Sequence, residues 1–160
     1  MSLQGYIENL PKKKRIVLAI KFAKLGIPIW ERYAKDNDLT YRDTVVGLTH
    51  SVEVSLLQRS ISSVEKYLGS NEMKRFFNGK RNIIKLRREF DEPIVALQDF
   101  DWTLPDEIQL VFYAVYNLLD AFLLNNKSSA YTSINQSIEV LEKSQILSVD
   151  DIRKILPSND

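Results

Sequence analysis

The 160-residue sequence has no cysteine, one histidine, five glycines and five prolines. Without cysteine the chain has no disulfide, no zinc–thiolate site and no cysteine nucleophile. A single histidine also excludes any site that needs two histidines from one chain. Scarce glycine and proline argue against a fold of short strands and tight turns. A content of 44% hydrophobic and 27% charged residues is typical of a folded domain.

Hydrophobic runs long enough to cross a membrane are also missing. The most apolar stretch, residues 108–124, has 17 residues and includes Gln109, Asn117 and Asp120, whereas a membrane-spanning helix needs about 20 apolar residues. Residues 1–5 lack the basic region and apolar run of a secretory signal. We therefore expect a cytoplasmic protein without a membrane span.

No motif for catalysis or cofactor binding is present: there is no phosphate-binding loop, Rossmann glycine pattern or nucleophile elbow. His50 is the one candidate general base. Asp43 and Glu53, seven residues before it and three after it, would share its face of a helix. This would suit a supported base or a weak metal site, but an ion-paired surface histidine is the commoner arrangement. We expect no enzymatic activity, no cofactor and no metal site.

Hydrophobic spacing favours helix along nearly the whole chain, which predicts an all-α fold in a single domain, residues 1–160. The strongest helix is expected over about residues 106–125, because apolar residues cover most of its circumference. Six or seven helices should form a bundle around this central helix. The other helices are expected within residues 11–36, 40–69, 71–91, 129–143 and 150–156.

Three of these helices carry more detailed expectations. Gly26 and Pro28 should kink or break the first helix. Residues 40–43 resemble a capping box, so they should open a long helix that ends at Gly69. Asn78 and Gly79 should interrupt the basic helical region. In the helix that ends at Gly69, the residues expected to face the core are Val45, Leu48, Val52, Leu56, Leu57, Ile61, Val64 and Leu68.

Charge is divided unevenly along the chain. Residues 1–88 contain 18 Lys and Arg against 8 Asp and Glu, and residues 89–160 contain 4 against 13. The resulting net charges of +10 and −9 almost cancel, because the whole chain has a formal net charge of +1. Such a division predicts either a charged partner or two regions that pair within the fold.

The cations are densest from Lys74 to Arg88, where seven of them surround Phe76 and Phe77. Nucleic-acid-binding proteins use cations to neutralise phosphates and aromatic side chains to stack on bases. The plainer interpretation is that the aromatic rings face the core and the cations are solvated. The candidate nucleic-acid contacts are Lys80, Arg81, Lys85, Arg87 and Arg88.

Residues 99–107 contain four acids and two large aromatic residues at the expected start of the central helix. An aromatic anchor with acids around it is typical of a protein-binding surface, where buried area gives affinity and charge gives orientation. The alternative is a loop whose aromatic residues fill the core and whose acids cap a helix. The candidate partner-binding residues are Asp99, Asp101, Trp102, Asp106 and Glu107.

Two stretches carry a resemblance to known proteins. Residues 19–31, AIKFAKLGIPIWE, form an apolar helix that leads into a proline and then aromatic and acidic residues. Residues 114–123, AVYNLLDAFL, precede a polar turn and a helix containing Ser137, Ile138 and Glu139. These stretches resemble a bacterial all-helical family, the YjaG-like domain of unknown function, and related toxin-immunity proteins. The resemblance implies a helical bundle without known catalysis and assigns no functional residue.

The sequence thus leads to two functional hypotheses. The first is a non-catalytic bacterial protein-interaction module, in its most specific form an immunity protein that binds a basic toxin through the acidic and aromatic region. The second is a nucleic-acid-binding helical protein that uses residues 74–88. In a third interpretation, without a partner, the basic and acidic halves simply pair with each other.

Overall fold

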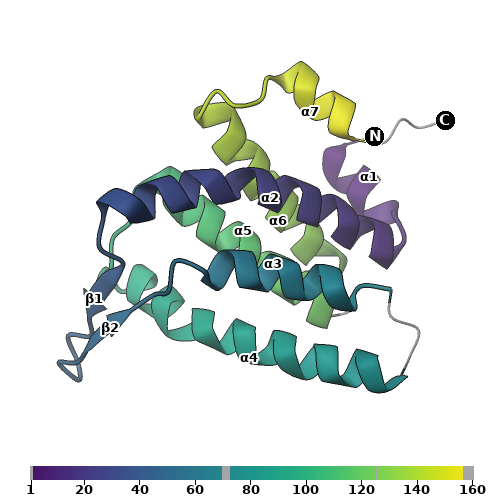
Figure 1. The fold of residues 1–160 in the computed structure, drawn as a ribbon. Coiled ribbons are helices and arrows are strands. Elements are labelled where there is room, and N and C mark those ends of the chain that lie inside the picture. The colour runs from purple at the N-terminus through teal and green to yellow at the C-terminus, as the bar shows by residue number, and fades with distance from the viewer. Residues whose placement is uncertain (1, 70–72, 125, 157–160) are drawn as a thin grey trace.

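The computed structural model describes residues 2–69, 73–124 and 126–156, except for the side chains of residues 73–77, 149 and 153. Within these residues the chain forms seven α-helices and one two-stranded antiparallel sheet (Figure 1). The elements, in chain order, are α1 (Leu3–Asn9), α2 (Lys12–Asp36), β1 (Thr40–Arg42), β2 (Thr49–Ser51), α3 (Leu56–Tyr67), α4 (Met73–Gln98), α5 (Asp106–Leu123), α6 (Lys127–Lys143) and α7 (Val149–Ile155).

Helix α5 is the centre of the bundle, as the sequence predicts. It contacts α2, α3, α4 and α6, and Val115, Leu118 and Leu119 on it are fully buried. Asp106 and Glu107 occupy its first turn, where negative charge interacts favourably with the helix dipole. The all-α prediction is confirmed, and no helix in the described part of the chain is long and apolar enough to span a membrane.

Helix α2 does not break at Gly26 and Pro28, so the expected break is wrong, and the alternative of a kink stays a prediction. The helix runs without interruption from Lys12 to Asp36. Pro28 lies on the exposed face, so the backbone hydrogen bond that it cannot donate is lost beside solvent. Ile27 and Trp30 are buried, and packing of residues on both sides of the proline holds the helix together.

The long helix expected over residues 40–69 is also wrong in its first half. Residues 40–51 form the β1–β2 hairpin, and only Leu56–Tyr67 is helical. Val45 and Leu48, expected in the core, are 92% and 57% exposed. A glycine at 47 with φ of +77° favours a turn over a helix. The later apolar positions behave as expected, because Leu57, Ile61 and Val64 are fully buried.

Helix α4 continues through Asn78 and Gly79, where an interruption was expected. The glycine serves close packing instead. Its backbone lies against Tyr67 of α3, and a Cβ atom at this position would be 2.3 Å from the Tyr67 Cγ. Asn82, one turn further along α4, donates a hydrogen bond to the Tyr67 hydroxyl at 2.7 Å. The small residue therefore allows α3 and α4 to approach each other.

An aromatic cluster joins the helices at the hairpin end of the bundle. Phe112 of α5 is fully buried. Its ring centroid lies 5.7 Å from that of Trp30 in α2 and 4.8 Å from that of Phe90 in α4. Trp102, in the loop before α5, meets Phe112 edge-on at 5.9 Å. The cluster thus fixes α2, α4 and the loop before α5 relative to the central helix.

The packing at Gly79 predicts that Gly79→Ala destabilises the protein, although alanine is the better helix former by about 1 kcal/mol. Overpacking of this kind costs about 1–3 kcal/mol, so the free energy of unfolding in urea should fall. Asn78→Ala is the matched control, because Asn78 is exposed on the same turn and should gain a few tenths of a kcal/mol from helix propensity. A gain of stability in Gly79→Ala would show that α3 and α4 are further apart.

Candidate functional site

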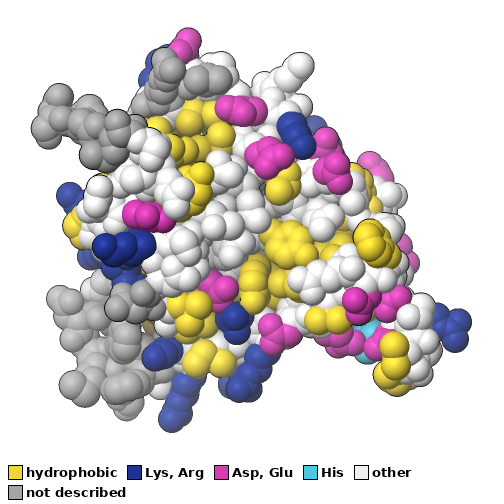
Figure 2. Space-filling model, turned by 180° about the vertical axis from the view of Figure 1, so that it is seen from behind, with side chains coloured by type: hydrophobic (Ala, Val, Ile, Leu, Met, Phe, Trp, Pro, Cys, Tyr) yellow, Lys and Arg dark blue, Asp and Glu magenta, His cyan; other side chains and the backbone are white. Residues whose placement is uncertain are grey.

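The abrupt change of charge in the sequence becomes a gradient along helix α4. Lys80, Arg81 and Lys85 lie toward its start, and Asp91 and Glu92 lie toward its end. Because α4 has 26 residues, it extends about 39 Å at 1.5 Å per residue. Figure 2 shows Lys and Arg side chains gathered toward one end of the molecule and many Asp and Glu side chains toward the other. The two signs are therefore concentrated at opposite ends of α4, while Arg42 of β1 places a cation on the hairpin.

Few ion pairs join the basic and acidic halves of the chain. In the described residues the pairs between them are Arg59–Glu89, His50–Glu92 and Arg87–Asp120. The other recorded pairs each lie within one half, as in Lys24–Glu65 and Lys143–Glu139. Internal pairing therefore leaves most of the divided charge facing solvent.

The candidate basic residues divide into two groups. Arg87 has a structural role: its half-buried guanidinium donates hydrogen bonds to the Asp120 carboxylate and to the Tyr116 hydroxyl. The bond to Asp120 raises the pKa of Arg87. Arg87 is therefore unsuited to bind a ligand. The exposed members, none of which pairs with an acid in the described residues, are Lys80, Arg81, Lys85 and Arg88. The side chains of Lys74, Arg75, Phe76 and Phe77 lie outside those described.

Helix α2 adds its own cations to this basic end. Burial lowers the pKa of Lys12, and the nearby positive charges of Arg15 and Lys80 lower it further. The start of α2 and the basic part of α4 are thus close in space. Lys66 and Lys85 line a groove between α3 and α4 with a volume of about 590 Å³. Concentrated positive charge beside a groove suits an anionic ligand.

The acidic and aromatic region is arranged differently from the sequence-based expectation. Trp102 is only 5% exposed, because it packs on Phe112 and Tyr41, so it is not available as a partner-binding anchor. Asp99 and Asp106 are exposed, whereas Asp101 and Glu107 are half-buried. The aromatic residue of this region that reaches solvent is Phe100, two residues before Trp102, and its side chain is 83% exposed.

The hairpin consists of two short antiparallel strands joined by a tight loop. Tyr41 pairs with His50, and their rings lie 5.4 Å apart. In the loop, the Asp43 carboxylate Oδ1 accepts hydrogen bonds from the backbone N–H groups of Val45 and Val46 at 2.8 and 3.1 Å. Such an Asx turn fixes the loop and leaves both valine side chains exposed.

Three attachments hold the hairpin on the bundle. Tyr41 stacks on Trp102 with 5.4 Å between ring centroids. The Thr44 hydroxyl donates to the Asp101 carboxylate at 2.9 Å. This bond places the hairpin loop beside the segment that carries Phe100. The loop between α4 and α5 and the hairpin therefore form one surface.

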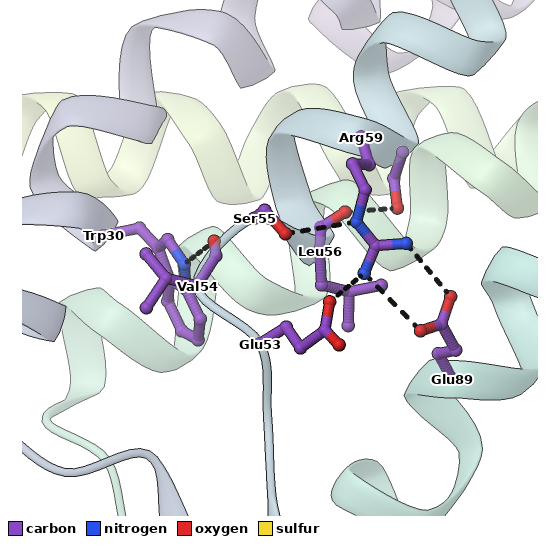
Figure 3. A network of polar contacts seen from close by, with 8 residues as sticks. Trp30, Glu53, Val54, Ser55, Leu56, Arg59 and Glu89 are labelled. Atoms are coloured by element: carbon purple, nitrogen blue, oxygen red, sulfur yellow. Dashed lines mark hydrogen bonds and ion pairs between the residues drawn. The ribbon is translucent and has the colours of Figure 1, made fainter.

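The third attachment is the polar network at the base of the hairpin (Figure 3). Trp30 Nε1 donates to the backbone carbonyl of Val54 at 3.0 Å. The Arg59 guanidinium donates to Glu53 at 2.9 Å and, more loosely, to Glu89 at 3.5 Å. These contacts tie the segment after β2 to α2, α3 and α4.

Phe100 has a backbone conformation that large residues avoid. It follows the end of α4 with φ of +61°, a position where helices usually place glycine. A non-glycine residue in this left-handed region costs about 1–2 kcal/mol. Because its ring is almost completely exposed, packing of the side chain offsets little of this strain. We call the surface made by this residue and its neighbours the hairpin surface; its members are Val45, Val46, Leu48, Asp99, Phe100 and Asp101.

His50 lies near the carboxylates of Asp43 and Glu92, whereas the sequence predicted Asp43 and Glu53. Its Nε2 is 2.8 Å from Glu92 Oε1, and Asp43 completes a cluster in which one ligand atom per residue lies within 4.8 Å of the others. Glu53 instead pairs with Arg59. Burial, followed by the charges of Glu92 and Asp43, raises the pKa of Tyr41 to about 12. Figure 2 shows the histidine side chain among acidic side chains next to hydrophobic ones.

Sequence reasoning missed Phe100, Val45 and Val46 as exposed residues. Gly47 in the middle of an expected helix, together with two β-branched residues before it, was the signal for a hairpin. Glu92 was missed because it is 42 residues from His50 in the sequence.

No family model, curated protein or solved structure matches the chain.

The left-handed conformation at residue 100 predicts that Phe100→Gly stabilises the free protein by about 1 kcal/mol, because glycine adopts positive φ without strain. The midpoint of thermal unfolding should rise. Phe100→Ala is the matched control: it removes the same exposed ring but keeps the strained backbone, so its midpoint should stay near that of the wild type. Equal midpoints for all three proteins would contradict the strain.

Proposed function

We propose that the protein is a non-catalytic protein-interaction module that binds its partner through the hairpin surface. The observation that carries this proposal is Phe100, an aromatic residue that is 83% exposed and held in a strained backbone conformation. Strain of this kind is typical of functional sites, where the surrounding structure maintains a costly conformation. Val45 and Val46, 92% and 65% exposed, follow Thr44, whose hydroxyl bonds to Asp101 directly after Phe100.

The charges around the apolar residues suggest the chemistry of the partner. Asp99, within this surface, and Asp106, in the first turn of α5, are exposed, and Asp101 is held in place by Thr44. An apolar centre with an acidic rim suits a partner that has a basic surface around an apolar pocket. A toxin nuclease would supply the basic part of such a surface, because it must bind phosphates. Together with the resemblance to toxin-immunity proteins, this supports an immunity protein as the specific form of the proposal.

The test is affinity capture from a nuclease-treated lysate of the organism that encodes the chain. Wild-type protein should retain a partner that Phe100→Ala loses, because loss of a buried aromatic anchor costs about 2 kcal/mol or more in binding. Asp99→Lys with Asp106→Lys should also lose it by reversing the charge of the rim. Leu124→Ala is the matched control, since Leu124 is 43% exposed at the far end of α5 and its loss should leave capture unchanged.

Capture that is unchanged by both the Phe100 and the aspartate variants would refute the placement of the surface. Circular dichroism of each variant excludes unfolding as the cause of a loss. A partner that is lost equally with Leu124→Ala would indicate nonspecific apolar binding and would also contradict the proposal.

The basic end supports a second candidate function, binding of nucleic acid. The convergence of Lys12 with Lys80 and the unpaired state of Lys85 in the described residues favour it. Binding of this kind falls steeply with salt, because each phosphate contact releases counterions. Lys80→Glu with Lys85→Glu should then abolish retention on single-stranded DNA or RNA at low salt. Absence of retention by the wild type at low salt would end this candidate.

A further inference from the structure

Three side chains that can coordinate a metal ion converge where the hairpin meets α4. Asp43 follows β1, His50 belongs to β2, and Glu92 lies on α4. One ligand atom from each lies within 4.8 Å of the other two. Because three separate segments supply the atoms, their convergence depends on the tertiary fold and not on local sequence.

The donor set suits a transition metal more than magnesium or calcium. Magnesium and calcium take oxygen ligands almost entirely, whereas an imidazole nitrogen with two carboxylates suits zinc and similar divalent ions. Asp43 is partly organised for this role: two backbone N–H groups hold its Oδ1, and no donor among the described residues reaches its Oδ2. Imidazole and carboxylate would supply three ligands and leave a fourth position for water.

The local charge and space also favour a cation. The carboxylates of Asp43 and Glu92 place two acids beside one histidine. A cavity of about 240 Å³ lies beside them and gives an ion and its water a route from solvent. Arg88 and Glu89 also line this cavity, and Glu89 pairs with Arg59.

We propose that Asp43, His50 and Glu92 form a binding site for a divalent transition-metal ion of the zinc type. Zinc bonds of about 2.0–2.2 Å place tetrahedral ligand atoms about 3.3–3.6 Å apart. The three ligand atoms already lie within 4.8 Å of one another, and the Glu92 side chain, which is 56% exposed, has room to adjust. The ion would replace the His50–Glu92 ion pair and connect the hairpin to α4. This site uses none of the residues of the hairpin surface, although Asp43 also accepts hydrogen bonds from the loop that carries Val45 and Val46.

The test uses the full chain, freed of metal with a chelator and titrated with zinc chloride. His50 is the only histidine, so its ring gives one set of NMR signals, and zinc should shift that set to a saturating endpoint of one ion per chain. Isothermal titration should show at least a tenfold loss of zinc affinity in His50→Ala, Glu92→Gln and Asp43→Asn. Even substitution of a residue that only supports a metal ligand lowers metal affinity by about 10–100-fold. Excess magnesium should not displace the zinc.

Glu53→Gln is the matched control, because Glu53 lines the same cavity but pairs with Arg59; it should bind zinc nearly as well as the wild type. Circular dichroism confirms that each variant is folded. No shift of the His50 signals at millimolar zinc would overturn the proposal. So would equal affinity in the wild type, Glu92→Gln and Asp43→Asn, since His50 would then bind an adventitious ion only.

Discussion

The packing of aromatic rings around Phe112 is the constraint on which the rest of the structure depends. This one buried side chain contacts Trp30 of α2, Phe90 of α4 and Trp102 of the loop before α5. Aromatic pairs of this kind add about 0.5–1.5 kcal/mol each beyond the area that they bury. Trp102 then supports Tyr41, so the hairpin is held by the same cluster. A two-stranded hairpin alone is marginally stable in water, and the aromatic support explains how it keeps its place.

The second organising feature is helix α4, which separates the charges of the molecule. Its basic part lies near the start of α2, and its acidic part faces the hairpin. Ion pairs at exposed sites contribute only about 0–1 kcal/mol each, so stability alone gives little reason to keep the charges this far apart. Separated charge has instead a strong effect on association with a charged partner, because its electric field orients the partner before contact.

Much of the helical fold follows from sequence periodicity, whereas the candidate sites do not. The spacing of apolar residues predicts α5 and its central place, because a helix that is apolar around most of its circumference must be surrounded. The hairpin escaped prediction because Val45 and Leu48 match a helical spacing that tertiary packing overrides. Trp102 and Phe100 are neighbours of opposite exposure, and only the left-handed backbone after α4 decides which of them reaches solvent. The His50–Glu92 contact depends on the docking of the hairpin onto α4, which local spacing does not encode.

The central claim is that Phe100 and the hairpin loop contact a protein partner, and site-specific photo-crosslinking inside living cells tests it most directly. A photoreactive phenylalanine analogue at position 100 keeps the aromatic ring and its exposure, so the partner interaction should survive. The account predicts a discrete crosslinked protein from position 100, and none from the same analogue at position 124, which is exposed at the far end of α5. A discrete product from position 124 with none from position 100 would contradict it.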